Sequence, residues 1–233
     1  MSEVNVVLVH GAWADGSSWA KVIEKLSTEK IKSVAAPLPL TSFADDIAAL
    51  ERTLERLSGS VVLVAHAYAG AVIGASKSEK VKGLVYVAAL APDEGETVAD
   101  VFYRTEPHPQ APKLTPDDYG LIYLPEAAFA TAFAQNATAQ EQTVLAAVQR
   151  PISPACITVA VDRPLWKDRP SWFLIAEQDR MIVPDTQHFM AARMNAQVRT
   201  ANVDHTPIVT APRAVVEIIL EAVRAASGVK DPS

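Results

Sequence analysis

The chain has 233 residues, with 21 Lys and Arg against 27 Asp and Glu, so its formal net charge is −6. An acidic chain without a basic stripe is not expected to bind nucleic acid or an anionic membrane surface as its main partner. The content of hydrophobic residues, 49%, excludes a disordered chain. A single cysteine, Cys156, excludes an internal disulfide framework and a cysteine-rich metal site. We find no secretory signal and no apolar run that could span a bilayer, and we therefore expect a cytoplasmic protein.

The first ninety residues alternate strand and helix patterns. Apolar, β-branched runs at 4–9, 31–36, 60–65 and 81–88 lack a polar face, which is typical of strands buried on both sides of a parallel sheet. Helical patterns lie between them, at 18–26, after the capping residues Thr41 and Ser42, and at 67–75.

The alternation stops near residue 92 and resumes after residue 167. The intervening residues show no clear strand, and Thr138 and Glu141 form a capping-box signal before an apolar run. Strands are then predicted at 171–176 and 197–203, and helices at 184–194 and 206–226. We interpret the chain as one α/β domain, with a core at 1–92 and 168–233 and a helical cap inserted at 93–167.

Strands separated by helices predict a doubly wound, mostly parallel sheet, in which ligands bind at the carboxyl ends of the strands. At one such end the strand 60–65 runs directly into a helix. A turn this tight strains its apex residue and requires small residues two positions to either side. Ala65 and Ala69 meet that requirement around Ala67. The segment has the spacing of a nucleophile elbow whose nucleophile is missing, although a plain strand–helix junction gives the same pattern.

A second candidate follows the first strand, where His10 and Gly11 precede Ala12 and Trp13. Glycine lets the backbone turn sharply, so that the amide of Ala12 can point into a pocket. With the amide of Tyr68, which follows the apex, it would form an oxyanion hole. A simple turn between strand and helix is the alternative.

The third candidate is a pair of ionisable side chains, each of which follows one of the last two strands in the sequence. Asp179 follows the strand 171–176, and His205 follows the strand 197–203. The order of apex residue, acid and histidine is that of α/β-hydrolase triads. Taken singly, an aspartate in a loop is a turn residue and a histidine is structural, but their joint placement favours a catalytic pair.

Five segments together resemble the α/β-hydrolase superfamily, and within it the small bacterial esterase-like proteins related to plant methyl-ester esterases and hydroxynitrile lyases. They are VNVVLVHGAWADGSSW, VVLVAHAYAGAVI, VKGLVYVAALAPDEGE, SWFLIAEQDRMI and DHTPIVTAPRAV. The resemblance implies a sheet of the α/β-hydrolase type with a helical cap. It also implies that His205 is a general base, that Asp179 orients it, and that the amides of Ala12 and Tyr68 are oxyanion donors. The family pattern at the elbow is Gly-His-Ser-x-Gly-Gly, and its serine falls on Ala67, whose methyl group cannot attack a carbonyl.

Three interpretations of Ala67 remain open. In the first, the alanine is an engineered replacement of a catalytic serine. In the second, it is native, and His205 acts as a general base on water or on a bound substrate. In the third, the chain is a catalytically inert pseudoenzyme that binds a small ligand. In each case we expect a small apolar ester or carbonyl compound as the partner, no cofactor and no metal ion. The sequence does not indicate an oligomeric state.

The aromatic residues of the predicted cap, with Trp13, are expected to line an apolar pocket; those selected are Phe102, Tyr103 and Tyr123, with Phe129 and Phe133 as further candidates.

The remaining nucleophiles and histidines receive structural roles. Ser17 and Ser18 are expected to cap a helix, and Cys156 to be buried and inert. His66 is expected to pack behind the elbow, and His108 and His188 to lie on the surface without an acidic partner.

Overall fold

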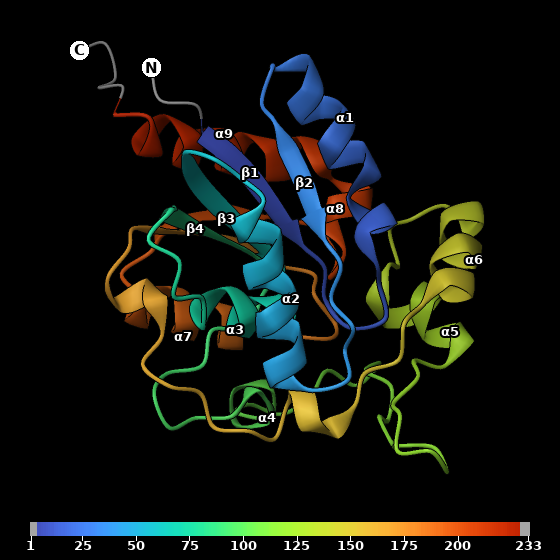
Figure 1. The fold of residues 1–233 in the computed structure, drawn as a ribbon. Coiled ribbons are helices and arrows are strands. Elements are labelled where there is room, and N and C mark those ends of the chain that lie inside the picture. Colours follow the sequence, from blue (N-terminus) through green and yellow to red (C-terminus); the bar gives the residue numbers. More distant parts are fainter. Residues whose placement is uncertain (1–3, 229–233) are drawn as a thin grey trace.

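Six parallel strands form one sheet in the order β2-β1-β3-β4-β5-β6 (Figure 1). The coordinates are a computed structural model that describes residues 4–228, so the ends of the predicted core at 1–3 and 229–233 lie outside the described residues. The predicted α/β class with a parallel sheet is confirmed. The strands are β1 Val4–Val9, β2 Ser33–Ala36, β3 Ser60–His66, β4 Val81–Val87, β5 Ser171–Ala176 and β6 Gln197–Ala201.

The four inner strands are mostly buried because most of their side chains are apolar in both directions. Every residue of β1 and of β5 is buried, whereas four of the five residues of β6, at the edge of the sheet, are exposed. Figure 1 shows α2 and α3 in front of the sheet and α1, α8 and α9 behind it. The helices of the core are α1 Ala20–Thr28, α2 Phe43–Glu55, α3 Ala69–Gly74, α7 Pro184–Arg193, α8 Pro207–Thr210 and α9 Pro212–Ala226.

The single helix predicted over 206–226 is wrong in one respect, because the structure divides it into α8 and α9. Ala211, between them, has φ −140° and ψ 50°, outside the helical region. Pro212 follows it, and the proline ring disfavours helical backbone in the residue before it. Proline has no amide hydrogen, so it is suited to the first turn of the new helix α9.

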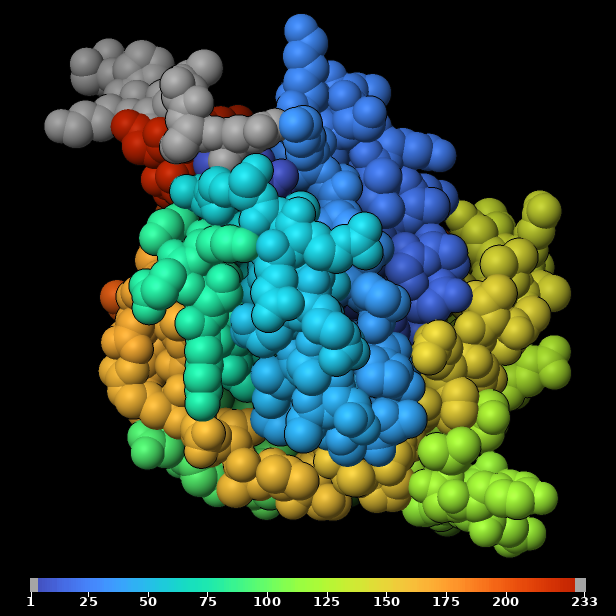
Figure 2. Space-filling view, in the orientation of Figure 1, coloured from blue at the N-terminus to red at the C-terminus, as the bar shows by residue number. Residues whose placement is uncertain are grey.

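The segment between β4 and β5 contains short helices and one isolated antiparallel bridge, Ile122 to Ile152. The capping box predicted at Thr138 and Glu141 is present at the start of α6. This segment, green to yellow-orange, lies along the lower and right edges of the molecule in Figure 2. Its helices are α4 Val98–Phe102, α5 Glu126–Ala128, a π-helix at Phe129–Phe133, α6 Ala139–Val148, and 3-10 turns at Pro154–Cys156 and Leu165–Lys167.

Within residues 4–228, no helix combines the length and the apolar composition needed to cross a membrane.

Candidate active site

The loops that follow β1 and β3 meet at the carboxyl edge of the sheet. The two strands are neighbours, and the chain leaves them toward opposite sides, so this is a topological switch point where parallel sheets bind ligands. A Cβ atom on Gly11 would lie 2.9 Å from Cβ of Ala67 and 3.0 Å from the carbonyl oxygen of His66. Glycine is therefore required at position 11 because the two loops approach too closely for a side chain.

Ala67 occupies the apex of a strained strand-to-helix turn. Its φ is +51°, in the left-handed region that alanine rarely adopts. The turn is fixed by the amide of Leu90, which donates to the carbonyl oxygen of Ala67 at 2.9 Å. Gly70 permits this contact, since a Cβ there would lie 2.2 Å from the Leu90 oxygen. The chain thus has the backbone geometry of a nucleophile elbow, with a methyl group at the position of the nucleophile.

Ala12 and Tyr68 are both buried and both line the cavity in front of Ala67. Neither of their amides donates to a turn, loop or cap acceptor within the described part of the chain. The following residue, Trp13, also has a positive φ of 58° and is held by two bonds to the segment between β4 and β5. Its amide donates to Arg150 at 3.0 Å, and its indole N–H donates to Ile122 at 2.9 Å. The unpaired amides of Ala12 and Tyr68 could stabilise negative charge on a bound oxygen.

His205 and Asp179 are both buried and form a hydrogen bond of 2.8 Å between Nδ1 and Oδ2. The carboxylate accepts three further bonds. The amides of Met181 and Ile182 donate to Oδ1 at 2.7 and 2.9 Å, and Nε2 of Gln187 donates to Oδ2 at 2.8 Å. Four donors hold Asp179 in one orientation, and Asp179 in turn orients the imidazole. The sequence does not single out Gln187, because nothing in the local pattern of α7 distinguishes it from other buried helix residues.

His66 supports the loop that carries His205. Its Nε2 lies 2.7 Å from the carbonyl oxygen of His205, and the two ring centroids are 4.9 Å apart. Burial, with the nearby imidazole of His205, lowers the pKa of His66 to about 3. The ring is therefore neutral at pH 7 and donates Nε2–H to that carbonyl, which agrees with a position behind the elbow.

Asp204 ties the same loop to the segment between β4 and β5. Its Oδ2 accepts from the amide of Asn136 at 2.9 Å, and its Oδ1 accepts from the hydroxyl of Thr210 at 2.6 Å. Asp204 is fully buried, so both bonds compensate for the loss of water around the carboxylate.

The side chain of Tyr68 is directed away from Ala67 into a buried polar cluster. Its hydroxyl donates to Oδ2 of Asp46 at 2.7 Å, and the Sγ of Cys156 lies 3.6 Å from the same oxygen. The amide of Leu40 donates to Oδ1 at 2.8 Å. Burial raises the pKa of Asp46 and raises that of Cys156 to about 12, so the thiol is not a nucleophile at neutral pH. The sequence does not single out Asp46, which is one of two acids in the first turn of α2.

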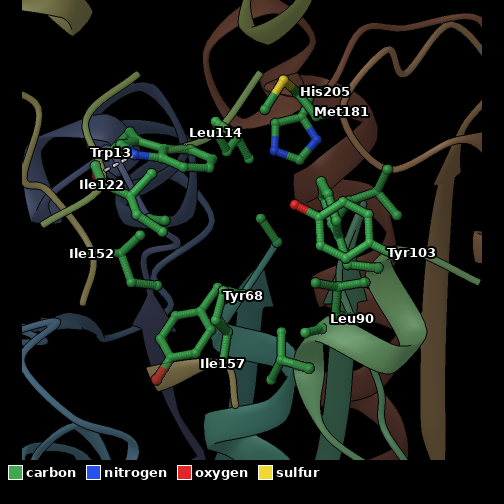
Figure 3. A pocket seen from close by; sticks show the side chains of 16 residues that line it. Trp13, Tyr68, Leu90, Tyr103, Leu114, Ile122, Ile152, Ile157, Met181 and His205 are labelled. Atoms are coloured by element: carbon green, nitrogen blue, oxygen red, sulfur yellow. Dashed lines mark hydrogen bonds between the residues drawn. The ribbon is translucent and has the colours of Figure 1, made fainter. Parts of the chain in front are cut away.

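The cavity in front of Ala67 is almost entirely apolar (Figure 3). It has a volume of about 70 Å³, and its lining includes Trp13, Phe102, Tyr103 and His205. His205 is the one histidine of this lining, which contains no aspartate, glutamate, lysine or arginine. Figure 3 shows the His205 ring at one wall and the Tyr103 hydroxyl directed toward the interior.

Three predicted aromatic residues do not belong to this lining. Tyr123 is 48% exposed, because the bridge to Ile152 turns the preceding residue, Ile122, into the cavity and Tyr123 toward the opposite side. Phe129 and Phe133 are buried behind the wall, and the Phe133 ring centroid lies 5.2 Å from that of His205. They support the histidine rather than contact a ligand.

The other sequence candidates lie outside the cavity. The expectation that Ser17 and Ser18 are helix caps is wrong, because both lie inside a 3-10 turn at Gly16–Trp19 whose N-cap is Asp15. Both serines donate to Asp15: Ser17 Oγ to the carboxylate and Ser18 Oγ to the backbone oxygen. The expectation that His188 has no acidic partner is wrong. Its Nε2 lies 3.0 Å from Oε1 of Glu177, because the start of α7 passes beside the end of β5.

Residues 6–218 match the family model of the alpha/beta hydrolase family, and the chain belongs to that family. A search of curated proteins gave no match. Similar solved structures include polyneuridine aldehyde esterase, with 18% identity, coverage of 95% of this chain and 99% of that chain, and a TM-score of 0.78.

Two further structures share the fold. A pyrethroid hydrolase from Sphingobium faniae has 19% identity, covers 96% of this chain and 99% of its own, and gives a TM-score of 0.76. A variant of tomato methylketone synthase I, in complex with β-ketoheptanoate, has 15% identity, covers 97% of this chain and 100% of its own, and gives a TM-score of 0.83.

The arrangement could move a proton with His205 and stabilise an oxyanion with two amides, but it has no side chain at Ala67 that could form an acyl intermediate. No three His, Cys, Asp or Glu side chains among residues 4–228 are grouped so as to hold a metal ion.

Proposed function

We propose that this chain binds a small, mainly apolar ester or other carbonyl compound and acts on it without a covalent intermediate, with His205 as general base. One observation carries the proposal: a buried imidazole that is hydrogen-bonded to a carboxylate lines one apolar cavity with Ala67, and Ala12 and Tyr68, whose amides have no acceptor in the described part of the chain, line the same cavity. Burying the ionisable side chains of His205 and Asp179 costs free energy of desolvation, and a pocket without a catalytic role would not need to keep them.

In the proposed mechanism Nδ1–H of His205 donates to Asp179, which leaves Nε2 unprotonated and able to accept a proton from water or from the substrate. For an ester, the water oxygen forms a bond to the carbonyl carbon while its proton moves to Nε2. The charge on the carbonyl oxygen is stabilised by the amides of Ala12 and Tyr68. The C–O bond to the leaving group then breaks, and the imidazolium returns the proton to the departing oxygen.

We further propose that residues 93–167 act as a cap on a core made of 1–92 and 168–233. Phe102, Leu114 and Ile152 from this segment supply apolar walls of the cavity, whereas His205, Ala12 and Tyr68 come from loops of the core. Such a cap excludes water and sets the shape of the substrate.

The proposal is tested by product analysis with purified protein on a panel of small alkyl and aryl esters and short β-keto acids. The keto acids are included because one structure of this fold contains β-ketoheptanoate. We expect turnover that falls at least a hundredfold in His205→Ala and is unchanged in His108→Ala, whose histidine is outside the cavity. Ligand binding without any product would contradict the proposal and support a binding protein that lacks catalysis.

Ala67→Ser tests the elbow independently of the substrate. The new hydroxyl would occupy the nucleophile position of the family, and we expect it to react with a fluorophosphonate probe to give a covalent adduct detectable by mass spectrometry. The double variant Ala67→Ser/His205→Ala is the control and should remain unlabelled. An unlabelled Ala67→Ser variant that is folded would show that the base or the amides are not placed for catalysis.

We also propose a cytoplasmic location, to be tested by fractionation of the native host; recovery from the medium would contradict it.

A further inference from the structure

A second cavity of about 390 Å³ adjoins the first. It is formed by the loop that follows α4 and by the residues that precede α7. Ala111, Pro112, Thr115 and Val183 line this outer cavity and not the inner one. The outer cavity has over five times the volume of the inner cavity, which is about 70 Å³.

Four side chains line both cavities and form the partition between them: Phe102, Tyr103, Leu114 and Met181. Tyr103 is 55% exposed, and its hydroxyl donates to no acceptor in the part of the chain that the structure describes. Figure 3 shows Tyr103 on the wall of the inner cavity. Because the partition includes a side chain without a polar anchor and a flexible methionine, rotamer changes on the nanosecond scale can open it.

The outer cavity has a fixed wall, because the start of its loop is attached to α7 at two points. The hydroxyls of Thr105 and Thr186 are 2.8 Å apart and hydrogen-bonded, and the guanidinium of Arg104 lies 3.5 Å above the ring of Phe189. Its lining is mainly apolar, with Lys113 as its charged residue. The cavity is therefore suited to an apolar group that continues from the inner cavity.

We infer that the substrate is an elongated carbonyl compound, whose carbonyl group lies beside His205 and whose unbranched apolar chain passes the partition into the outer cavity. The inference rests on the proposed function, since it places the reacting group at His205. An unbranched chain is the occupant that displaces the four partition side chains least. Each methylene that enters the outer cavity is removed from water, which should strengthen binding about threefold to fourfold.

The test measures the dissociation constants of unbranched 2-alkanones of increasing length by calorimetry. These probes contain a carbonyl group and no leaving group. We expect affinity to rise about threefold with each methylene in the original protein. Ala111→Trp, which fills the outer cavity, should remove this dependence for the longer probes and keep the affinity of the shortest. Asp118→Trp is the matched control, because Asp118 is exposed and lines neither cavity. Thr115→Trp replaces Ala111→Trp if that variant does not fold.

The same dependence on chain length in the blocked variant and in the original protein, or no dependence in either, would overturn the inference. These outcomes are separable from failure of the proposed function, because binding is measured without turnover and is repeated in His205→Ala. A length dependence that Ala111→Trp abolishes, in a protein without any turnover, would support the outer cavity as a chain-binding site and contradict only the proposed chemistry.

Discussion

The carboxyl edge of the sheet and the segment between β4 and β5 supply different kinds of group to one pocket. The sheet loops supply the imidazole of His205 and two unpaired amides, and the carboxylate of Asp179, which orients the imidazole, accepts from four donors. The other segment supplies mainly apolar side chains, such as Phe102 and Ile152, together with Tyr103. Reactivity and shape therefore come from separate parts of the chain, so that substitutions in the sheet loops should change chemistry and substitutions between β4 and β5 should change ligand choice.

The largest effect should come from Asp179→Asn. The asparagine amide group would face donors that now point at a carboxylate, and His205 would lose the acceptor that fixes its orientation. We expect activity on any substrate found to fall roughly a hundredfold to ten-thousandfold, with a smaller change in substrate affinity. Steady-state kinetics with Asp162→Asn, an exposed aspartate, as the control would check this. If Asp179→Asn changed only KM and left kcat unaltered, the proposed separation of catalytic groups from shape-determining groups would be wrong.

Asp46→Ala should destabilise the junction between the two regions. It removes the acceptor of the Tyr68 hydroxyl and of the Leu40 amide, both of which would remain buried. We expect the free energy of unfolding to fall by about 2–3 kcal/mol in urea titrations. Asp45→Ala, at the exposed neighbouring position on α2, removes the bonds that Oδ2 accepts from the hydroxyls of Thr41 and Ser42, and it should cost about 1 kcal/mol or less. Equal losses in the two variants would show that the buried cluster has no special role.

Stability should fall in mild acid because of His66. The folded protein binds a proton on this ring only near pH 3, whereas the unfolded chain binds one at an ordinary pKa of 6.5. The stability contributed by the neutral ring is therefore lost as the pH falls from 6.5 toward 3, and by pH 5 the loss is about 2 kcal/mol. Urea titrations at pH 7 and pH 5 should show a smaller difference in His66→Gln than in the original protein. An identical pH dependence would assign the effect to other groups.

The smallest effect concerns the apex. Ala67→Gly relieves the left-handed backbone of residue 67 and should raise the free energy of unfolding by about 0.5–1 kcal/mol. Ala69→Gly, at a helical position two residues later, should lower it by a similar amount. Thermal unfolding of the two variants would measure these opposite changes. Destabilisation by both would mean that the turn is not strained.

Most of the sheet could be predicted because its signals are local. The strand at 171–176 was predicted with the boundaries that the structure shows, since a buried strand is a short apolar run between turn residues. The predicted helix at 206–226 failed where Pro212 restricts the backbone of Ala211, a local signal that the helical pattern on both sides obscured.

The site was only partly predictable. Ala67, Asp179 and His205 follow strands, so their place in the chain already indicates the edge of the sheet on which they lie. Asp46 and Gln187 are helix residues with nothing unusual beside them, and Asp46 meets Cys156 across 110 positions of sequence.

By itself, the sequence determined the order of strands and helices, the small residues around the apex and the methyl group at position 67, because each depends on residues close together in the chain. Only the tertiary structure decided which aromatic residues face the cavity, which groups anchor Asp179 and Tyr68, and that a second cavity adjoins the first. These features arise where distant segments pack together, and packing depends on the shapes of side chains that no local pattern specifies.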